Sequence, residues 1–264
     1  MSLVQFPSHS TTFSTLFTVG VLGLIPFRCA QATPVGDPLP GPSGLGVIPT
    51  TQTVAPNQFA ASLGSEYVDV SGADGHARLL PFANLSYGFN NGEVGASYLN
   101  QKTDIEGFSS SNSYFTLHGK YRLYNSPDGK TAFAVGAHYY DFGSDSGTDL
   151  GDTLSLYATG SYEFRKNNER SIARFHLGVL GQRVHVSGDS TTFARPFVGV
   201  EALLSPDVSI AADYLTKHSD VAQGYTLSVR YQPQNKPLSA QIGVGKLRSD
   251  TKFFVGLTYT FGHK

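Results

Sequence analysis

Charged side chains recur at every second position in several segments of this sequence. Lys120 and Arg122 are separated by one residue, and so are Arg174 and His176. In an extended strand, residues two apart lie on the same face, so these side chains would line one face of a sheet. Where such a face encloses water, a ring of charges selects ions, and a basic ring favours anions. The candidate pore-lining residues identified in this way are His118, Lys120, Arg122, Glu163, Arg174, His176, Arg195, Glu201, Asp213, Lys217 and Arg230.

The charge balance of this set is positive. It holds six basic and three acidic residues, a surplus of three positive charges. The imidazoles of His118, His138 and His176 would add to that surplus at low pH. The balance predicts a narrow channel with a mild preference for anions.

A second interpretation is that these charges pair with one another and fill the interior. Arg174 would lie opposite Glu163 across one hairpin, and Arg230 could reach Asp213 on the next strand. Barrels of about eight strands are filled by side chains, whereas barrels of about sixteen leave an open channel. A barrel of about twelve strands lies between these limits, so an open pore and a plugged barrel both remain.

Motifs for enzymatic or metal chemistry are weak. Residues 141–152 carry four carboxylates, but their spacing does not match a helical calcium loop. Residues 242–247 (IGVGKL) lack the full glycine spacing of a phosphate-binding loop and the Ser or Thr that follows its Lys. The sequence has neither a Gly-x-Ser-x-Gly nor a His-Glu-x-x-His motif. We therefore expect no enzyme activity, no metal and no cofactor.

One enzymatic alternative is kept open. Some outer-membrane barrels are lipid hydrolases with a Ser and His pair at the rim. His76, His185 and His218 fall near the expected outer rim with serines close by in the sequence, so a membrane-embedded lipid hydrolase is the weakest of the hypotheses.

The elements that position these residues show a period of two from Phe59 to the end of the chain. In residues 113–124, Leu117 and Tyr121 fall on one face, and His118 and Arg122 fall on the other. Such alternation predicts strands and argues against helices. The expected strands are residues 59–70, 79–89, 93–103, 113–124, 131–142, 153–165, 172–186, 193–204, 208–217, 224–232, 237–247 and 252–261.

Composition favours strands that cross a membrane. Only 15% of the residues are charged, and the chain contains 29 Gly, 14 Tyr and 18 Phe. Past residue 32, no apolar run approaches the ~20 residues that a membrane helix needs. Few charges without a long apolar run are typical of a barrel in lipid, because apolar and polar residues alternate. The formal net charge of −1 gives no indication of a nucleic-acid partner.

Connection lengths and aromatic positions agree with a barrel. Short turns alternate with longer polar loops, and aromatic residues gather beside the short turns, as in the aromatic girdle of a membrane barrel. The expected short turns are residues 90–92, 126–129, 206–207 and 233–236, and the expected loops are residues 104–112, 143–152 and 187–192. The predicted fold is therefore an all-β, antiparallel up-and-down transmembrane β-barrel of about twelve strands, with both termini in the periplasm.

Two segments precede the barrel. Residues 1–32 combine the apolar stretch 13–27 with small residues at Ala30 and Ala32, which is typical of a cleaved signal peptide. Residues 33–58 hold six prolines and can form neither a helix nor a full strand ladder. They are either a linker at the periplasmic mouth or a segment that folds back into the lumen, and residues 59–264 form the barrel.

The C-terminal residues 253–261 (FFVGLTYTF) alternate apolar positions and close on an aromatic. This ending resembles the C-terminal signature of bacterial outer-membrane β-barrels, although three residues follow the aromatic here. The resemblance implies recognition by the barrel-insertion machinery. A further resemblance, carried by residues 44–51 (GLGVIPTT), by Gln58 and Phe59, and by residues 93–98 (EVGASY), is to exopolysaccharide-associated outer-membrane barrels.

These observations predict a protein of the bacterial outer membrane that acts as a narrow, porin-like passive channel. The alternative is a non-transporting barrel with a structural, adhesion or polysaccharide-export accessory role. The expected partners are outer-membrane lipids and lipopolysaccharide, the insertion machinery and small solutes.

Overall fold

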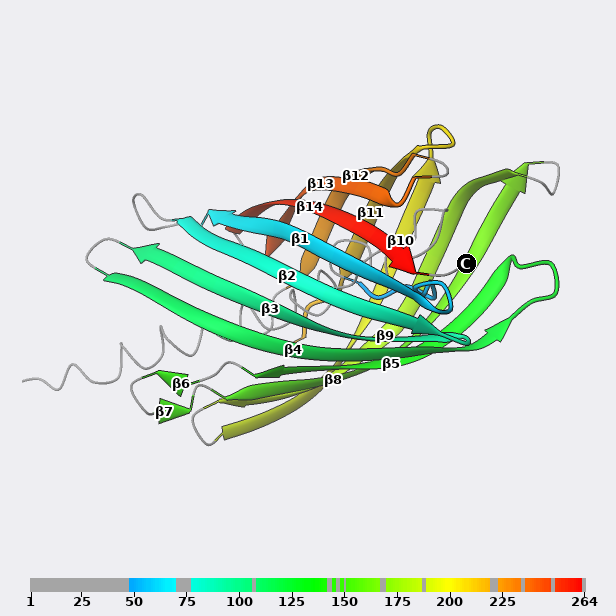
Figure 1. Cartoon of the computed structure of the whole chain (residues 1–264). Coiled ribbons are helices and arrows are strands. Elements are labelled where there is room, and N and C mark those ends of the chain that lie inside the picture. Colours follow the sequence, from blue (N-terminus) through cyan, green and yellow to red (C-terminus); the bar gives the residue numbers. More distant parts are fainter. Residues whose placement is uncertain are drawn as a thin grey trace, which may run out of the picture.

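The computed structural model describes residues 48–69, 77–105, 108–141, 144–145, 148–149, 151–166, 170–186, 189–218, 223–233, 236–247 and 250–262. Twelve strands close into one antiparallel barrel, so the predicted all-β barrel of about twelve strands is confirmed, whereas the periplasmic location of the termini stays a prediction (Figure 1). Within the described ranges, no helix is long and apolar enough to cross a membrane.

The barrel strands follow one another around the ring in chain order, and the last strand pairs with the first. They are β1 (Gln58–Asp69), β2 (Ala77–Phe89), β3 (Gly92–Ile105), β4 (Phe108–Asn125), β5 (Thr131–Asp141), β8 (Asp152–Lys166), β9 (Arg170–Val186), β10 (Asp189–Leu203), β11 (Val208–Leu215), β12 (Gly224–Tyr231), β13 (Leu238–Leu247) and β14 (Asp250–Gly262). Between β5 and β8, the strands β6 (Ser144–Asp145) and β7 (Thr148–Asp149) form a separate small hairpin.

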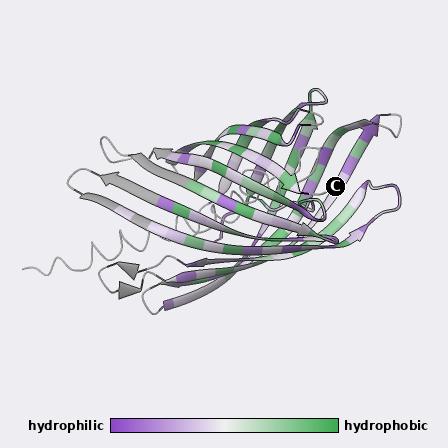
Figure 2. Ribbon diagram, viewed as in Figure 1, coloured by the Kyte–Doolittle hydropathy of each residue, from purple (hydrophilic) through white to green (hydrophobic). Residues whose placement is uncertain are grey.

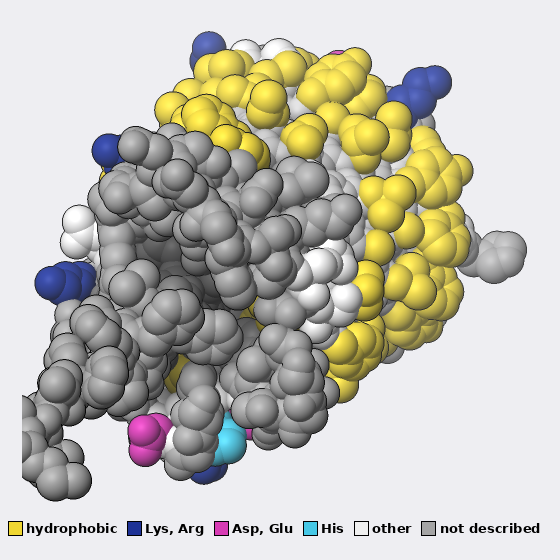
Figure 3. All heavy atoms as spheres, turned by 90° about the vertical axis from the view of Figure 1, so that its left-hand side faces the viewer, with side chains coloured by type: hydrophobic (Ala, Val, Ile, Leu, Met, Phe, Trp, Pro, Cys, Tyr) yellow, Lys and Arg dark blue, Asp and Glu magenta, His cyan; other side chains and the backbone are white. Residues whose placement is uncertain are grey.

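The two faces of the barrel wall differ in polarity. In β12, Leu227 and Val229 point outward and are 54% and 43% exposed, whereas Ser228 and Arg230 point inward and are 3% and 2% exposed. The same alternation runs along most strands (Figure 2), and hydrophobic side chains cover much of the outer wall (Figure 3). An apolar outside around a polar inside is the arrangement of a barrel whose outer face meets lipid.

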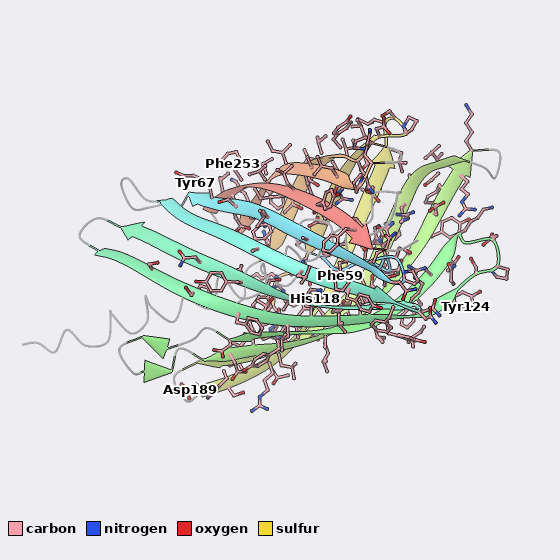
Figure 4. The ribbon with its side chains drawn as sticks, viewed as in Figure 1. Phe59, Tyr67, His118, Tyr124, Asp189 and Phe253 are labelled. Atoms are coloured by element: carbon pink, nitrogen blue, oxygen red, sulfur yellow. The ribbon has the colours of Figure 1, made fainter. Side chains whose placement is uncertain are left out.

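The two ends of the barrel carry different connections. We call one end the turn end: there, only residues 90–91 join β2 to β3 and residues 204–207 join β10 to β11. Gln58 and Gly262 also lie at this end, where β1 and β14 pair. We call the opposite end the loop end. Figure 4 shows Phe59 and Tyr124 toward the turn end, and Tyr67 and Asp189 toward the loop end.

The loop end differs from the sequence prediction. The expected loop 104–112 is mostly strand, because β3 runs to Ile105 and β4 begins at Phe108. The expected loop 187–192 is likewise mostly strand. These polar stretches pair through backbone hydrogen bonds. The prediction relied on alternating apolar residues, and polar stretches do not show that alternation. Since β4 has 18 residues and a tilted membrane strand needs about 9–11, such strands are long enough to extend beyond the lipid.

Aromatic rings on the inner face lie against glycines of the neighbouring strand. A Cβ atom added to Gly136 would meet the ring of Tyr157, and one added to Gly178 would meet the ring of Phe197. Gly64 with Phe82 and Gly243 with Phe254 repeat this arrangement. Covering glycines with rings in this way supports a curved sheet.

The seam between the first and last strands carries stacked aromatics. Phe59 pairs with Phe261, with ring centroids 5.5 Å apart, and Phe59 also lies 4.9 Å from the ring of Tyr87. Tyr124 and Tyr231, each 52% exposed, lie at the same end of the barrel, where the sequence analysis expected an aromatic girdle. Rings at this level suit the interface between headgroups and acyl chains.

Candidate pore and its charge network

Nine of the eleven predicted pore-lining residues are buried, with exposures of 0–7%, and lie on the inner face of the barrel. They are His118, Lys120, Glu163, Arg174, His176, Arg195, Glu201, Asp213 and Arg230. Arg122 is half-buried on the same face. Lys217 is different: β11 ends at Leu215, and the Lys217 side chain is exposed. The predicted strand 208–217 was therefore too long, and Lys217 is not part of the wall.

A chain of ion pairs runs along one side of the lumen. Arg174 contacts Glu163 at 2.5 Å and Glu201 at 3.5 Å, and Arg230 contacts Glu201 at 3.2 Å. Glu163, Arg174 and Glu201 are direct cross-strand partners on β8, β9 and β10. The charges therefore pair along the wall rather than across the lumen. Buried charges need such pairing because their desolvation is costly.

Arg230 differs from its predicted pairing with Asp213. Its cross-strand partner on β11 is Ser209, and its guanidinium reaches past that serine to Glu201 on β10. Asp213 instead accepts a hydrogen bond of 2.6 Å from the hydroxyl of Thr226. A serine is short enough to leave room for this longer contact.

Three lumen charges were missed in the sequence analysis. Glu93 lies 3.5 Å from Lys120, and Glu66 lies 3.7 Å from Lys252. Glu66 stands in a strand whose alternation is blurred by alanine and glycine, and Glu93 and Lys252 stand at strand starts. All three residues fall on the polar face of their strands when positions are counted in steps of two, and this count could have identified them.

These additional residues change the charge balance. The buried charged side chains in the described part of the chain are five basic and five acidic, so they cancel. The predicted surplus of three is therefore too large. The excess that remains inside the wall comes from Arg122, which is half-buried, and from Arg165, whose side chain is 24% exposed next to Glu163.

We call residues 48–57 the strap: residues 48–54 are buried inside the barrel, and Pro56 and Asn57 are exposed where the segment reaches the turn end. Backbone and hydroxyl groups of the strap make six hydrogen bonds to side chains of the wall. The bonds are Lys120 Nζ to the Thr50 carbonyl (3.1 Å), Arg122 Nε to the Thr51 carbonyl (3.2 Å), Arg122 Nη2 to Thr53 Oγ1 (3.0 Å), Thr159 Oγ1 to the Pro49 carbonyl (3.4 Å), the Val54 amide to Glu93 Oε2 (2.8 Å), and Thr51 Oγ1 with Ser161 Oγ (2.5 Å).

The strap crosses from one wall of the lumen toward another. Near its C-terminal end, Val54 bonds to Glu93 on β3. At its N-terminal end, Ile48 is fully buried in an apolar cluster whose other members are Tyr157, Leu180, Phe197, Ala211 and Leu215. Several of these residues are on β9, β10 and β11, which are four to six places from β3 in the ring of twelve. The strap therefore occupies the interior rather than following one strand.

The chain reverses direction where the strap meets β1. Asn57 adopts a left-handed backbone conformation, with φ of 62°, which asparagine tolerates better than most residues. The Asn57 amide donates to the Gly88 carbonyl at 2.8 Å. A Cβ atom at Gly88 would collide with the carbonyls of Val54 and Ala55, so glycine is needed for the strap to turn inward here.

Two of the lumen histidines, His118 and His138, have close partners. His118 and His138 face each other with ring centroids 5.8 Å apart, and His118 Nε2 lies 3.0 Å from Ser86 Oγ. His138 also packs edge-on against Tyr157. Across the described ranges, no group of three or more His, Cys, Asp or Glu residues is placed to hold a metal ion.

Two of the three rim histidines lie within the described residues. His185 Nδ1 lies 3.6 Å from Asp152 at the loop end. His218 stacks on Phe193 with ring centroids 5.4 Å apart. His76 lies outside the described residues. Ser190 is the cross-strand partner of His185 on β10, and its hydroxyl accepts a hydrogen bond of 3.1 Å from Arg183 Nε.

The closed ring of twelve strands, the apolar outer face and the charged lumen together define a β-barrel of the kind that crosses a membrane. No family model matches the sequence, and no curated protein matches it. Solved structures do match. The KdgM porin aligns with a TM-score of 0.53 and 13% identity over 76% of this chain and 99% of that porin.

Two further structures are similar. The NanC porin aligns with a TM-score of 0.54 and 14% identity over 75% of this chain and 98% of that porin. The COG4313 outer membrane channel from Pseudomonas putida F1 aligns with a TM-score of 0.59 and 8% identity over 80% of this chain and 98% of that channel. At these identities, the comparisons establish a shared fold.

Proposed function

We propose that the protein is a passive outer-membrane channel for small hydrophilic solutes. The observation that carries this proposal is the direction of the lumen side chains. The ion pairs of Glu163, Arg174 and Glu201 join neighbouring strands, and rings such as Phe197 lie against wall glycines. In a barrel between the filled and the open size classes, side chains that stay along the wall leave room for a polar path.

The selectivity that fits this lumen is a weak preference for anions. The buried charges cancel, so no strong basic ring is present in the described wall. Arg122 has no carboxylate partner among the described residues, and it donates instead to the strap. An arginine in this position would attract anions near the turn end.

The outer surface supports the proposed location and partners. Leu227 and similar outward side chains would contact acyl chains, and the aromatics near the turn end would lie at a headgroup interface. The outer-membrane neighbours in structure support placement in that membrane. Lipopolysaccharide and other outer-membrane lipids would surround the wall, and the insertion machinery would recognise the final strand.

The filled lumen favours one alternative, a barrel that does not transport. The strap crosses the interior with six hydrogen bonds to the wall. If it is permanent, the working surface would be the outer end of the barrel, in a structural, adhesion or export-accessory role.

Conductance in planar bilayers tests the proposal. We expect the mature chain to give discrete current steps, and Arg122→Ala to lower the ratio of chloride to potassium permeability. Asp189→Asn is the matched control, because Asp189 is exposed at the loop end and should leave that ratio nearly unchanged. Silence from a chain shown by gel mobility to be folded, with or without the strap, would contradict the channel and favour the alternative.

A further inference from the structure

We propose that the strap, residues 48–57, is a gate that closes the lumen from the turn end and opens the channel when it leaves. This inference rests on the proposed channel function. It concerns a part of the molecule that is separate from the barrel wall, and it explains why a barrel of intermediate width holds a polypeptide segment inside.

Closure follows from the path of the strap. Ile48 reaches the apolar cluster beside Leu180 and Phe197, while Val54 is held at Glu93 on β3. A chain that spans between these walls crosses the solute path. The residues between them, Thr50 to Thr53, are 0–7% exposed, so this stretch is packed against its surroundings.

Release does not require the barrel to unfold. The twelve-strand ladder closes through β1 and β14, and no strap residue belongs to a barrel strand. The six hydrogen bonds named above join the strap to wall side chains, and at its C-terminal end Asn57 also bonds to the Gly88 carbonyl and to the Tyr87 hydroxyl of β2. Four of these six bonds involve a charged side chain and are stronger than neutral ones, but water can replace each of them when the groups separate. The strap can therefore exchange its bonds for water while the wall stays intact.

The hinge lies at the turn between the strap and β1. Asn57 carries the left-handed backbone conformation, and Gly88 lets Val54 and Ala55 pass close to β2. Rotation at this junction moves the strap without altering the register of β1, which begins at Gln58. Element-terminal residues commonly absorb such changes.

Opening would also change the chemistry of the lumen. In the closed state, the Thr50 and Thr51 carbonyls accept hydrogen bonds from Lys120 and Arg122. Departure of the strap frees these donors at the turn end. Lys120 keeps its contact with Glu93 at 3.5 Å, so Arg122 gains the most access to solutes. The open channel should thus prefer anions more than the closed one.

A reversible crosslink tests the gate. Thr51 Oγ1 and Ser161 Oγ lie 2.5 Å apart, so the pair Thr51→Cys and Ser161→Cys should form a disulfide that fixes the strap. The background carries Cys29→Ser, which removes the only native cysteine. We expect several-fold lower conductance after oxidation, and recovery with a larger chloride preference after reduction. The Cys29→Ser parent, given the same oxidant and reductant, should show no change.

A variant lacking residues 33–56 separates the two proposals. If the strap is a gate, this variant should conduct constantly, and neither the oxidant nor the reductant should change its conductance. If the oxidised pair, with its disulfide verified by mass spectrometry, conducts as well as the reduced pair, the gate is wrong and the channel stands. If the folded reduced pair and the folded shortened variant are both silent, the channel function itself is wrong.

Discussion

Among the single residues of the lumen, we expect Glu201 to contribute most to the stability of the folded barrel. It contacts both Arg174 and Arg230 and also accepts a hydrogen bond from Ser209 at 3.1 Å. Its side chain is fully buried. Removing its charge would leave two buried guanidinium groups short of one acid, and uncompensated buried charge is strongly destabilising.

We therefore predict that Glu201→Gln lowers the free energy of unfolding by about 3–5 kcal/mol. Urea unfolding of the purified barrel in detergent micelles, followed by gel mobility, measures the change. Asp189→Asn on the same strand, β10, serves as control, because this carboxylate is exposed. Equal midpoints for the two variants would show that the ion-pair chain does not stabilise the barrel.

The glycines under aromatic rings give a second residue-scale prediction. Gly178→Ala places a methyl group 2.3 Å from both the Phe197 ring and the Ala158 carbonyl oxygen. We expect it to destabilise the barrel by about 1–3 kcal/mol through overpacking, and to push the ring into the lumen, so conductance falls. Gly160→Ala is the matched control, since its nearest contacts would be carbonyl oxygens at 3.9 Å. A Gly178→Ala variant as stable and conductive as the control would contradict this packing.

Most lumen residues could be predicted from the sequence because a strand has a fixed period of two. Arg174 and Glu201 fall inside long alternating segments, where the inward face is unambiguous. Glu66 and Glu93 were missed because small residues blur their strands and a strand start has too few neighbours to define a face. Pairing that skips a strand, as between Arg230 and Glu201, depends on side-chain reach, which the sequence does not contain.

At the scale of elements, the twelve barrel strands were predictable and their ends were not. Apolar alternation stops where the lipid stops, but backbone pairing continues, so β3 and β4 run past the expected loop 104–112. The position of the strap inside the barrel could not be predicted from the sequence either, but for a different reason. Its prolines exclude regular structure, and its inward turn depends on Gly88 of β2, while side chains that bind it, such as Lys120 and Ser161, come from strands much further along the chain.

The final strand yields a prediction about assembly. Phe261 is the last aromatic of β14 and stacks on Phe59. We expect Phe261→Ala to lower the folded fraction recovered from cell envelopes more than the folded fraction obtained by refolding in detergent, because the insertion machinery acts only in cells. Phe253→Ala is the control, since Phe253 is on the same strand and also faces outward, 51% exposed.

Gel mobility before and after boiling reports both folded fractions. If the two substitutions lower recovery from envelopes equally, the insertion machinery does not recognise Phe261 specifically. Loss in detergent refolding as well as in cells would instead indicate that the aromatic stack at the seam is required for closure of the barrel.

At the scale of the whole molecule, the account rests on an inverted polarity: apolar side chains outside and charged side chains within. This polarity explains the low charge content, the absence of a long apolar run past residue 32 and the balanced buried charges. It also explains why a polar strap can be housed inside the barrel, because its carbonyls and amides find charged partners there.

Site-directed spin labelling along β12 in lipid bilayers tests this polarity most directly. Labels placed singly at Leu227, Ser228, Val229 and Arg230 are exposed to oxygen, which partitions into lipid, and to a water-soluble nickel complex. We predict accessibility with a period of two: oxygen favoured at Leu227 and Val229, the nickel complex favoured at Ser228 and Arg230. The same accessibility at all four positions, or the opposite phase, would contradict a barrel that holds its apolar face to lipid.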